Sequence, residues 1–319
     1  MIDLKNKKIL VTGANSMVGR SVIESLSLRG AQIDAVYHEQ CDLLEYKNIA
    51  DRIKRSEPDY CIHAAGYNGN IKFNKEFPSD IFYNTTVMGL NTLKACALHG
   101  VKKVVSPLAS CAYRSTDEQL QEKDFHLGMP DLSVEAHGLG KKTIFYYSRQ
   151  IYKQYDTAAV CTIFNTVYGP HDSYDINKTK VVGGLIKKFT DAVESGEKKV
   201  VCWGTGRPRR ELIYCADAAE GIVQTLEKYN EVDWPINIGF NTDVNIKELA
   251  QTIARLANFE GQIMWDTTRP DGQYRKILNS DRMKKYDINI KNPIFLEDGL
   301  KKTIEWYVKQ RSQERTNEN

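Results

Sequence analysis

Short apolar runs alternate with amphipathic stretches along the first half of the chain. The runs are rich in Val and Ile and end in glycine or in small or polar residues, a pattern typical of buried parallel strands. Repeated strand–helix units with right-handed crossovers predict an α/β fold with a doubly wound parallel sheet. The expected strands lie at about 9–12, 31–37, 60–66, 103–107 and 159–164, and the expected helices end near 29, 56, 99 and 152.

The second half of the chain predicts a smaller unit beside this sheet. We expect residues 200–238 to return to the main sheet, so that 1–167 and 200–238 form one sheet domain. Residues 168–199 and 239–311 would then form a smaller α/β cap, and the polar residues 312–319 a disordered tail. The expected helices of the second half lie at 181–189, 216–229, 246–257 and 296–310, with a strand at 262–265.

The turn after the first strand has the composition of a phosphate-binding loop. Gly13, Ser16 and Gly19 have the spacing of a GxxGxxG motif between a strand and a helix. Such a turn directs backbone N–H groups and a helix N-terminus at one point, where a dinucleotide pyrophosphate can bind. Ser16 replaces the middle glycine and offers a hydroxyl instead of clearance. We therefore expect a Rossmann-type dinucleotide site with contacts from Gly13, Asn15, Ser16, Met17, Val18 and Gly19.

Residues at the ends of the other strands help to select the dinucleotide. An acidic residue after the second strand would bind the ribose of NAD, whereas a cation would bind the 2′-phosphate of NADP. Arg20 and His38 favour the phosphate and Glu39 favours the ribose, so the sequence favours NADP(H) and leaves NAD(H) open. Small residues after the third strand leave space for ribose and phosphates. The expected contacts are His38, Asp42, Leu43, Ala64, Ala65, Gly66 and Phe164.

Composition narrows the class of protein further. The 319 residues carry a net charge of +3 without a basic stripe interleaved with aromatic residues, so nucleic acid is not expected as a partner. The seven cysteines are widely spaced and form no CxxC pair, which favours reduced thiols in a cytoplasmic protein and implies no metal site. No apolar run approaches the roughly 18 residues of a membrane span, so no membrane association is expected.

Three polar segments follow the strands of the sheet domain. They are Ala109-Ser110-Cys111-Ala112-Tyr113, His137-Gly138-Leu139-Gly140-Lys141 and Asn165-Thr166-Val167-Tyr168-Gly169-Pro170-His171-Asp172. With the glycine loop they resemble the extended short-chain dehydrogenase/reductases, the family of NAD-dependent epimerases/dehydratases. Within that family the resemblance is greatest to the GDP-L-fucose synthases and covers nearly the whole chain. It implies an NAD(P)-dependent enzyme that epimerises and reduces a GDP-linked 4-keto sugar.

The resemblance implies that Cys111 and His171 move protons at C3 and C5 of the sugar. A 4-keto group acidifies both neighbouring carbons because the carbanion is delocalised into an enolate. Inversion then needs one group to remove a proton from one face and another to return it on the opposite face. A thiol whose pKa is lowered by Lys141 or by an oxidised nicotinamide can take the proton, and an imidazole can return it.

Two positions depart from the reductase pattern of the family. Family reductases use a serine, a tyrosine and a lysine to deliver the proton that accompanies hydride transfer, and here these positions hold Ala109, His137 and Lys141. Ser110 is a neighbouring hydroxyl that could lean into the site. A histidine is mostly neutral at pH 7, and the charge of Lys141 should lower its pKa further. His137 is therefore a poorer acid at neutral pH, although it can still donate an N–H.

The second half supplies the residues that the resemblance assigns to the nucleotide and the sugar. They lie in two segments, 200–211 and 269–276. An arginine suits a pyrophosphate because its planar fork donates two parallel charge-assisted hydrogen bonds, which makes Arg210 the main candidate. The expected substrate contacts are Asn165, Trp203, Arg210, Arg269 and Asp271.

Three functions stay open. The leading one is a GDP-sugar enzyme that epimerises C3, C5 or both and also reduces C4 with His137 and Lys141. Alternatives within the same class are a reductase without epimerisation, or an epimerase that has lost reduction because of Ala109 and His137. The alternative of another class is a catalytically weak protein that binds a nucleotide sugar or a dinucleotide. The resemblance also implies a homodimer through two long helices, one of which carries Phe145, Tyr146, Tyr152 and Tyr155.

Overall fold

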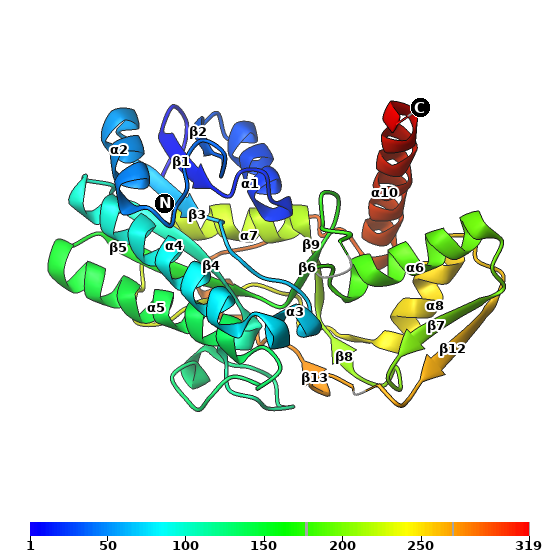
Figure 1. Ribbon diagram of the computed structural model, residues 1–319. Coiled ribbons are helices and arrows are strands. Elements are labelled where there is room, and N and C mark those ends of the chain that lie inside the picture. The colour runs from blue at the N-terminus through cyan, green and yellow to red at the C-terminus, as the bar shows by residue number, and fades with distance from the viewer. Residues whose placement is uncertain (176–177, 270, 319) are drawn as a thin grey trace.

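Six parallel strands form the main sheet, in the order β10-β5-β4-β3-β1-β2 (Figure 1). The structure is a computed structural model that describes residues 1–175, 178–269 and 271–318. These strands are almost entirely buried apart from β2, as expected for a parallel sheet covered on both faces. The doubly wound α/β fold is thereby confirmed. The strands are β1 (Lys8–Thr12), β2 (Gln32–Val36), β3 (Tyr60–His63), β4 (Lys103–Ala109), β5 (Ala158–Phe164) and β10 (Ile236–Asn237).

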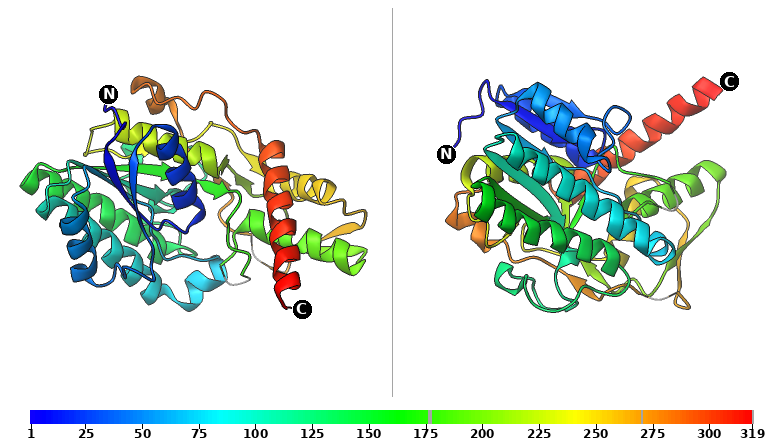
Figure 2. Two further views of the ribbon diagram at one scale, coloured as in Figure 1. Left: turned by 90° about the horizontal axis from the view of Figure 1, so that it is seen from above. Right: turned by 60° about the vertical axis from the view of Figure 1, so that its left-hand side comes forward.

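Helices cover both faces of this sheet (Figures 1 and 2). One face carries α1 (Met17–Leu28) and α7 (Cys215–Lys228), which pack against each other. The other face carries α2 (Tyr46–Ser56), α4 (Pro78–Leu98) and α5 (Glu135–Tyr155), with the short α3 (Ile71–Glu76) before α4. Each apolar helix stripe is buried on the sheet, and each face has its own hydrophobic core cluster.

The strand order places a crevice beside β1. Strand β1 lies between β2 and β3, so the chain leaves it in opposite directions on its two sides. Ligands of open parallel sheets bind at such a switch point, outside the carboxyl ends of the strands. The glycine loop after β1 and the small residues after β3 therefore lie at one place.

The smaller unit lies beside the carboxyl ends of the main strands and is built on short sheets (Figure 1). Helix α10 (Leu296–Glu318) leaves it as a long terminal helix. Its strands are β7 (Lys199–Trp203) paired with β12 (Gln262–Asp266), β8 (Arg209–Arg210) between β11 (Val244–Asn245) and β13 (Arg275–Lys276), and β6 (Thr166–Tyr168) paired with β9 (Leu212–Tyr214). Its other helices are α6 (Val181–Ser195), α8 (Ile246–Leu256) and α9 (Asp281–Lys285). In the main-sheet unit, two 3-10 turns at Ser110–Ala112 and Glu122–Asp124 precede α5.

Residues 200–238 do not all return to the main sheet, contrary to expectation. Strand β7 pairs with β12 in the smaller unit, and only α7 and β10 of this range lie on the main sheet. The reason is visible in the side-chain pattern of β7, where Val200 and Cys202 are buried while Val201 and Trp203 are exposed. Such alternation suits a sheet with one face in solvent rather than one covered on both faces.

The terminal residues are helical where we expected a disordered tail from 312. Helix α10 continues through Glu318. Its later turns gain partners that composition alone does not reveal, since Arg311 forms ion pairs with Asp191 and with Glu194 of α6. The Thr316 hydroxyl also donates to the Ser312 carbonyl within the helix, at 2.9 Å.

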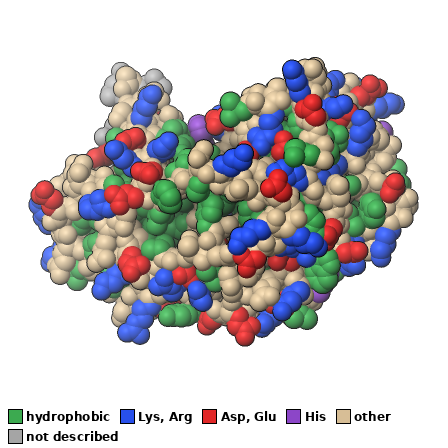
Figure 3. Space-filling view, turned by 180° about the vertical axis from the view of Figure 1, so that it is seen from behind, with side chains coloured by type: hydrophobic (Ala, Val, Ile, Leu, Met, Phe, Trp, Pro, Cys, Tyr) green, Lys and Arg blue, Asp and Glu red, His purple; other side chains and the backbone are tan. Residues whose placement is uncertain are grey.

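Charged side chains of both signs are interspersed over the face seen in Figure 3. The net charge of +3 is therefore not gathered into a field of one sign on that face. None of the helices among the described residues combines the length and the apolar character that crossing a membrane requires.

Candidate active site and cofactor cradle

The glycine loop and the residues after β3 touch each other, which explains why both consist of small residues. Gly13 has a φ of +67°, and a Cβ there would lie 2.7 Å from the backbone of Ala65. A Cβ on Gly19 would lie 2.1 Å from the Gly13 carbonyl oxygen. Ser16 uses its hydroxyl to accept from the Gly19 N–H at 3.0 Å and so caps α1. The loop leaves the N-terminus of α1 open to a bound anion, as the sequence predicts.

A buried histidine that we did not predict supports this crevice. The Thr12 hydroxyl lies 3.0 Å from His63 Nδ1 and accepts from the Ala65 N–H at 3.3 Å. Burial lowers the pKa of His63 to about 3, so its ring is neutral. The hydrogen bonds that link His63, Thr12 and Ala65 fix the backbone at Ala65. In the sequence, only the position of His63 at the end of a strand could have indicated this role.

The other expected cofactor residues lie at the glycine loop and at or after the carboxyl ends of β2, β3 and β5. Arg20 donates to both the carbonyl and the side-chain oxygen of Asn15, at 3.1 and 3.2 Å. Asp42 accepts from the Leu44 N–H at 3.0 Å, and the Asn91 amide holds the Leu43 carbonyl at 2.9 Å. Burial separates the remaining positions: Met17, Leu43 and Phe164 are buried, Val18, Asp42, Ala64 and Ala65 are half-buried, and Asn15, His38 and Gly66 are exposed.

Lys141 connects the crevice to the segment that carries Cys111. Its ammonium donates to the Pro107 carbonyl at 2.9 Å, and a Cβ on Gly66 would lie 3.7 Å from its Nζ. Burial lowers the pKa of Lys141 to about 8. The group therefore stays largely protonated at neutral pH but can release a proton more readily than an exposed lysine.

Cys111 and His137 form the central contact of the site. Cys111 lies in the 3-10 turn after β4, and His137 lies in the first turn of α5, one helical turn before Lys141. Cys111 Sγ and His137 Nδ1 are 3.2 Å apart. His137 is buried, whereas Cys111 is the one cysteine of the chain that is not fully buried.

Both members of this pair are uncharged at neutral pH. Burial raises the pKa of the Cys111 thiol, although the charges of Lys276, Lys141 and Lys180 act in the opposite direction. This corrects our expectation that nearby charge lowers the thiol pKa overall. Burial, followed by the charges of the same three lysines, holds the pKa of His137 well below its usual value. A neutral thiol and a neutral imidazole thus lie in a strongly positive field.

His171 packs apart from the Cys111–His137 contact, and its expected role on the opposite face of the sugar stays a prediction. It is exposed, has a φ of +67°, and its ring packs against Trp306 of α10 with 4.8 Å between ring centres. Burial lowers its pKa somewhat, and the nearby charges are those of Arg20 and Glu24 on α1. The structure brings His137, rather than His171, to the thiol.

Ser110 and Asn165 belong to a hydrogen-bonded chain that ends on a buried carboxylate. The Ser110 hydroxyl donates to Asn165 Oδ1 at 2.8 Å, and Asn165 Nδ2 donates to Glu211 Oε2 at 3.4 Å. Glu211 is 1% exposed. We did not single out Glu211 from the sequence, because a glutamate beside Arg210 looks like an ordinary surface charge.

Apart from Asn165, which follows β5, the expected substrate residues lie in the smaller unit. Trp203 is 61% exposed and lies between Lys188 and Arg269, whose cationic groups are 5.2 and 5.3 Å from its ring centre. Asp271 accepts from the backbone N–H and the hydroxyl of Thr205, at 2.8 and 2.7 Å. Burial lowers the pKa of Arg210, while Asp131, Asp271 and Asp117 act to raise it. The guanidinium of Arg210 is thus half-buried beside acidic groups.

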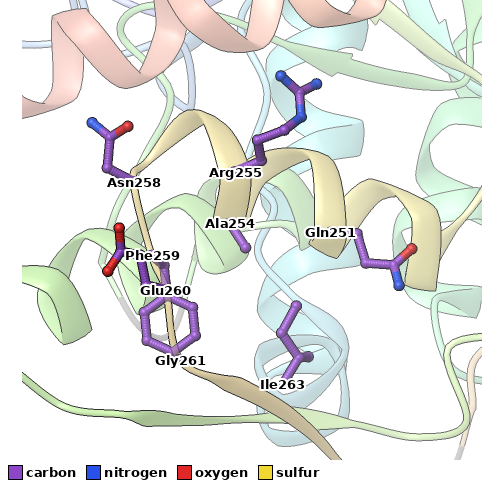
Figure 4. A pocket seen from close by; sticks show the side chains of 8 residues that line it. All are labelled: Gln251, Ala254, Arg255, Asn258, Phe259, Glu260, Gly261 and Ile263. Atoms are coloured by element: carbon purple, nitrogen blue, oxygen red, sulfur yellow. The ribbon is translucent and has the colours of Figure 1, made fainter.

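A depression of about 420 Å³ also lies in the smaller unit (Figure 4). It is formed by α8 and the loop that leads to β12, and Cys111, His137 and Lys141 are not among its lining residues. We therefore locate the chemistry at the Cys111–His137 contact and not in this depression. The lining residues are Gln251, Ala254, Arg255, Asn258, Phe259, Glu260, Gly261 and Ile263.

Known proteins resemble this chain over most of its length. A family model described as NAD dependent epimerase/dehydratase family matches residues 9–239. GDP-L-colitose synthase of Yersinia pseudotuberculosis is 30% identical over 311 residues, which cover 96% of this chain and 99% of that protein. GDP-L-fucose synthase of Escherichia coli (strain K12) is 27% identical over 320 residues, covering 96% and 98%. The crystal structure of a GDP-L-fucose synthetase from Naegleria fowleri bound to NADP is similar with a TM-score of 0.86 at 25% identity, covering 97% and 96%.

Proposed function

The chain belongs to the NAD dependent epimerase/dehydratase family, and from this premise we propose that it epimerises C3, C5 or both of a GDP-linked 4-keto sugar. The observation that carries the proposal is the 3.2 Å contact between Cys111 Sγ and His137 Nδ1, surrounded by the charges of Lys141, Lys180 and Lys276. Relatives that cover nearly the whole chain are a GDP-L-colitose synthase and GDP-L-fucose synthases, which supports a GDP-sugar as substrate.

The positive field suits the charge that develops in this reaction. Removing a proton beside the 4-keto group places negative charge on the ketone oxygen, and fixed positive groups in a site shielded from water stabilise that charge. Lys141, Lys180 and Lys276 supply these groups. Because they act most strongly on the enolate and little on the neutral sugar ring, they lower the barrier to proton removal.

Cys111 and His137 serve one face of the sugar as a unit. The thiol donates its proton to the enolate carbon and becomes a thiolate. The thiolate regains a proton from His137 Nδ1 while His137 Nε2 takes one from water, so the ring stays neutral. The opposite face needs a second group. Lys180 precedes α6 in the smaller unit, is exposed, and its charge reaches both Cys111 and His137. We assign it this role in place of His171: its unprotonated amine takes the sugar proton, and the ammonium that results then stabilises the enolate.

The crevice beside β1 fits a dinucleotide. A Cβ at Gly13 or Gly19 would fill the space at the glycine loop, and the N-terminus of α1 lies open beside this loop. We propose NADP(H) as the dinucleotide, because Arg20 and His38 lie near the loop and the Naegleria fowleri relative is bound to NADP. The pyrophosphate would be held by the loop, and the ribose near the nicotinamide by Lys141. When bound, the cofactor supplies or accepts a hydride at C4.

Reduction at C4 is the second candidate activity. It is favoured by the position of Lys141, whose ammonium lies beside Gly66 and has a pKa of about 8. His137 occupies the place of the family's tyrosine, but its Nδ1 faces Cys111. We therefore expect epimerisation to be faster than reduction in this protein.

The test is incubation with GDP-4-keto-6-deoxymannose in deuterated water, with and without NADPH or NADH, followed by mass spectrometry and proton NMR. We expect deuterium at C3, C5 or both without a requirement for cofactor oxidation. Cofactor oxidation at a comparable rate would instead support the reductase. If neither deuterium incorporation nor cofactor oxidation occurs while the protein still binds GDP, the result would support a nucleotide-sugar binding protein.

A further inference from the structure

Glu211 accepts hydrogen bonds from three separate segments of the chain. Its Oε1 accepts from the N–H groups of Phe240 and Asn241, at 2.9 and 3.2 Å. Its Oε2 accepts from the N–H of Leu278 at 2.8 Å and from Asn165 Nδ2. Four donors are directed at the two carboxyl oxygens. If Glu211 were protonated, the added proton would therefore face one of these N–H groups. The arrangement therefore requires an ionised carboxylate, which only accepts.

The surrounding backbone is built to admit this carboxylate. A Cβ on Gly239 would lie 2.4 Å from Glu211 Oε1, so a larger residue there would displace the carboxylate. The backbone N–H of Glu211 donates to the Lys276 carbonyl at 3.0 Å, and the Thr166 N–H donates to the Glu211 carbonyl at 3.3 Å. Glu211 thus joins the smaller unit to the end of β5 through both its side chain and its backbone.

We infer that Glu211 is a positioning residue that holds the turn of Cys111 in its reactive geometry through Asn165 and Ser110. This inference rests on the proposed function of Cys111. Glu211 only accepts, so Asn165 must present its amide nitrogen to Glu211 and its oxygen to Ser110. Ser110 must then donate, and the turn that carries Cys111 has one favoured hydrogen-bond polarity.

The same carboxylate connects the turn to the nucleotide side of the site. Arg210, the expected pyrophosphate contact, directly precedes Glu211 in the chain. Binding of an anion at Arg210 therefore acts on a backbone segment whose next side chain fixes the Cys111 turn.

A second buried glutamate offers a matched control. Glu122 is 5% exposed and accepts from the Asn237 N–H at 3.1 Å, in the same region between the two units. Its hydrogen bond to Asn237 reaches the Cys111 turn only through the Tyr113 hydroxyl, and a glutamine at position 122 still accepts from the Asn237 N–H. Burial raises the pKa of both glutamates, so Glu122→Gln reproduces the cost of neutralising a buried carboxylate without disturbing the chain to Cys111.

The experiment measures alkylation of Cys111 by iodoacetamide as a function of pH, by peptide mass spectrometry on the full chain. The other six cysteines are buried, so labelling should be selective. In Glu211→Gln an amide N–H faces N–H donors, and an unmet buried donor costs enough to loosen the turn and accelerate alkylation by about tenfold. A looser turn should also bury the thiol less. Because burial raises the pKa of Cys111, the pH at which alkylation reaches half of its maximum rate should fall. Glu122→Gln should change neither.

A double variant tests the polarity of the chain. Asn165→Asp combined with Glu211→Gln restores a donor opposite an acceptor at this link, because the new amide donates to the new carboxylate, which accepts from Ser110. The Leu278 N–H still faces the amide nitrogen, so the restoration is partial. Alkylation should return toward the rate of the unsubstituted protein. Equal alkylation in all variants, or equal acceleration by Glu122→Gln, would overturn the inference. If the alkylation results hold but no deuterium enters the sugar, the positioning role stands and the proposed function fails.

Discussion

The Cys111 thiol and the His137 imidazole are both uncharged at neutral pH, which determines what each can do. A thiol with a raised pKa is a proton donor, and an imidazole with a lowered pKa is not a cation that would repel the neighbouring lysines. A tyrosine at position 137 would instead present a hydroxyl with a much higher reference pKa. We therefore expect the histidine that stands in place of the family's tyrosine to act on the thiol rather than in ketone reduction.

Single substitutions can distinguish the roles of His137 and His171 in proton transfer. His137→Gln removes the ring that contacts Cys111 and should lower deuterium incorporation into the sugar by at least about 100-fold, the usual contribution of a positioned acid or base. His171→Gln changes an exposed ring that packs on Trp306 and should leave incorporation within about twofold. The measurement is the initial rate of exchange by mass spectrometry. The reverse order of effects would restore His171 as the proton-transfer group.

Sequence spacing could predict the neighbourhood of Ser110, Cys111, His137 and Lys141 because they lie on short, regular connections from β4 and in α5, while their catalytic roles stay predictions. The surroundings of His171 could not be predicted, because the loop after β6 passes through Gly169 at φ +155° and His171 at φ +67°. Backbone conformations of this kind reorient a side chain, and the residue types alone do not specify them. Glu211 was missed for another reason, since its burial depends on loops far away in the sequence.

Among the elements, the strands and helices of the main sheet were predictable because each carries its own apolar period. Strand β7 was assigned to the wrong sheet because a short apolar strand does not reveal its partner, although its alternating exposure now explains the pairing with β12. Helix α10 extends further than its polar sequence predicts because Arg311 finds acidic partners on α6. Both differences arise from tertiary contacts.

One contact between elements should be visible in the pH dependence of stability. Lys103 of β4 is 2% exposed and donates to the Thr225 and Leu226 carbonyls at the end of α7, at 3.0 and 2.6 Å. Burial lowers its pKa to about 7. Between this value and its unfolded value of about 10.4, the unfolded chain binds the extra proton, so stability should rise with pH by about 1 kcal/mol per unit from this group.

The variant Lys103→Met should remove that rise, because methionine has a similar length and does not titrate. The free energy of unfolding is measured by urea denaturation at several pH values between 7 and 10. Lys102→Met is the matched control, since Lys102 is an exposed neighbour, and its slope should equal that of the unsubstituted protein. An unchanged slope in Lys103→Met would mean that Lys103 is not the titrating group.

For the whole molecule, buried polar groups join the smaller unit to the main sheet. Glu211 is one such group, and Asn237 is another, accepting from the Tyr113 hydroxyl at 2.7 Å and donating to the Leu120 and Asn279 carbonyls, each at 3.0 Å. Both connect to the segment between β4 and α5. Because every such bond would leave a buried polar group unpaired if the units separated, the units should move little relative to each other near Cys111.

Helices α4 and α5 pack side by side and expose aromatic residues on the surface of the molecule. Phe145, one of the aromatic residues of α5, is buried in the core, but Tyr146, Tyr152 and Tyr155 are at least partly exposed, as are Phe82 and Tyr83 of α4. Exposed aromatic residues gathered on neighbouring helices are typical of an interface. We expect the chain to form a homodimer in which α4 and α5 of each copy pack together.

Tyr83→Glu tests this expectation, because Tyr83 is 59% exposed in the single chain and a dimer would bury the introduced carboxylate without a partner. Sedimentation equilibrium should give twice the chain mass of 36.4 kDa for the unsubstituted protein and close to the chain mass for the variant. Phe295→Glu changes a more exposed aromatic residue, 73% exposed just before α10, and should leave the dimer intact. A Tyr83→Glu protein that remains dimeric would move the interface away from α4. Dissociation by Phe295→Glu alone would place it near the smaller unit, where a partner copy would stand close to the substrate side of the site.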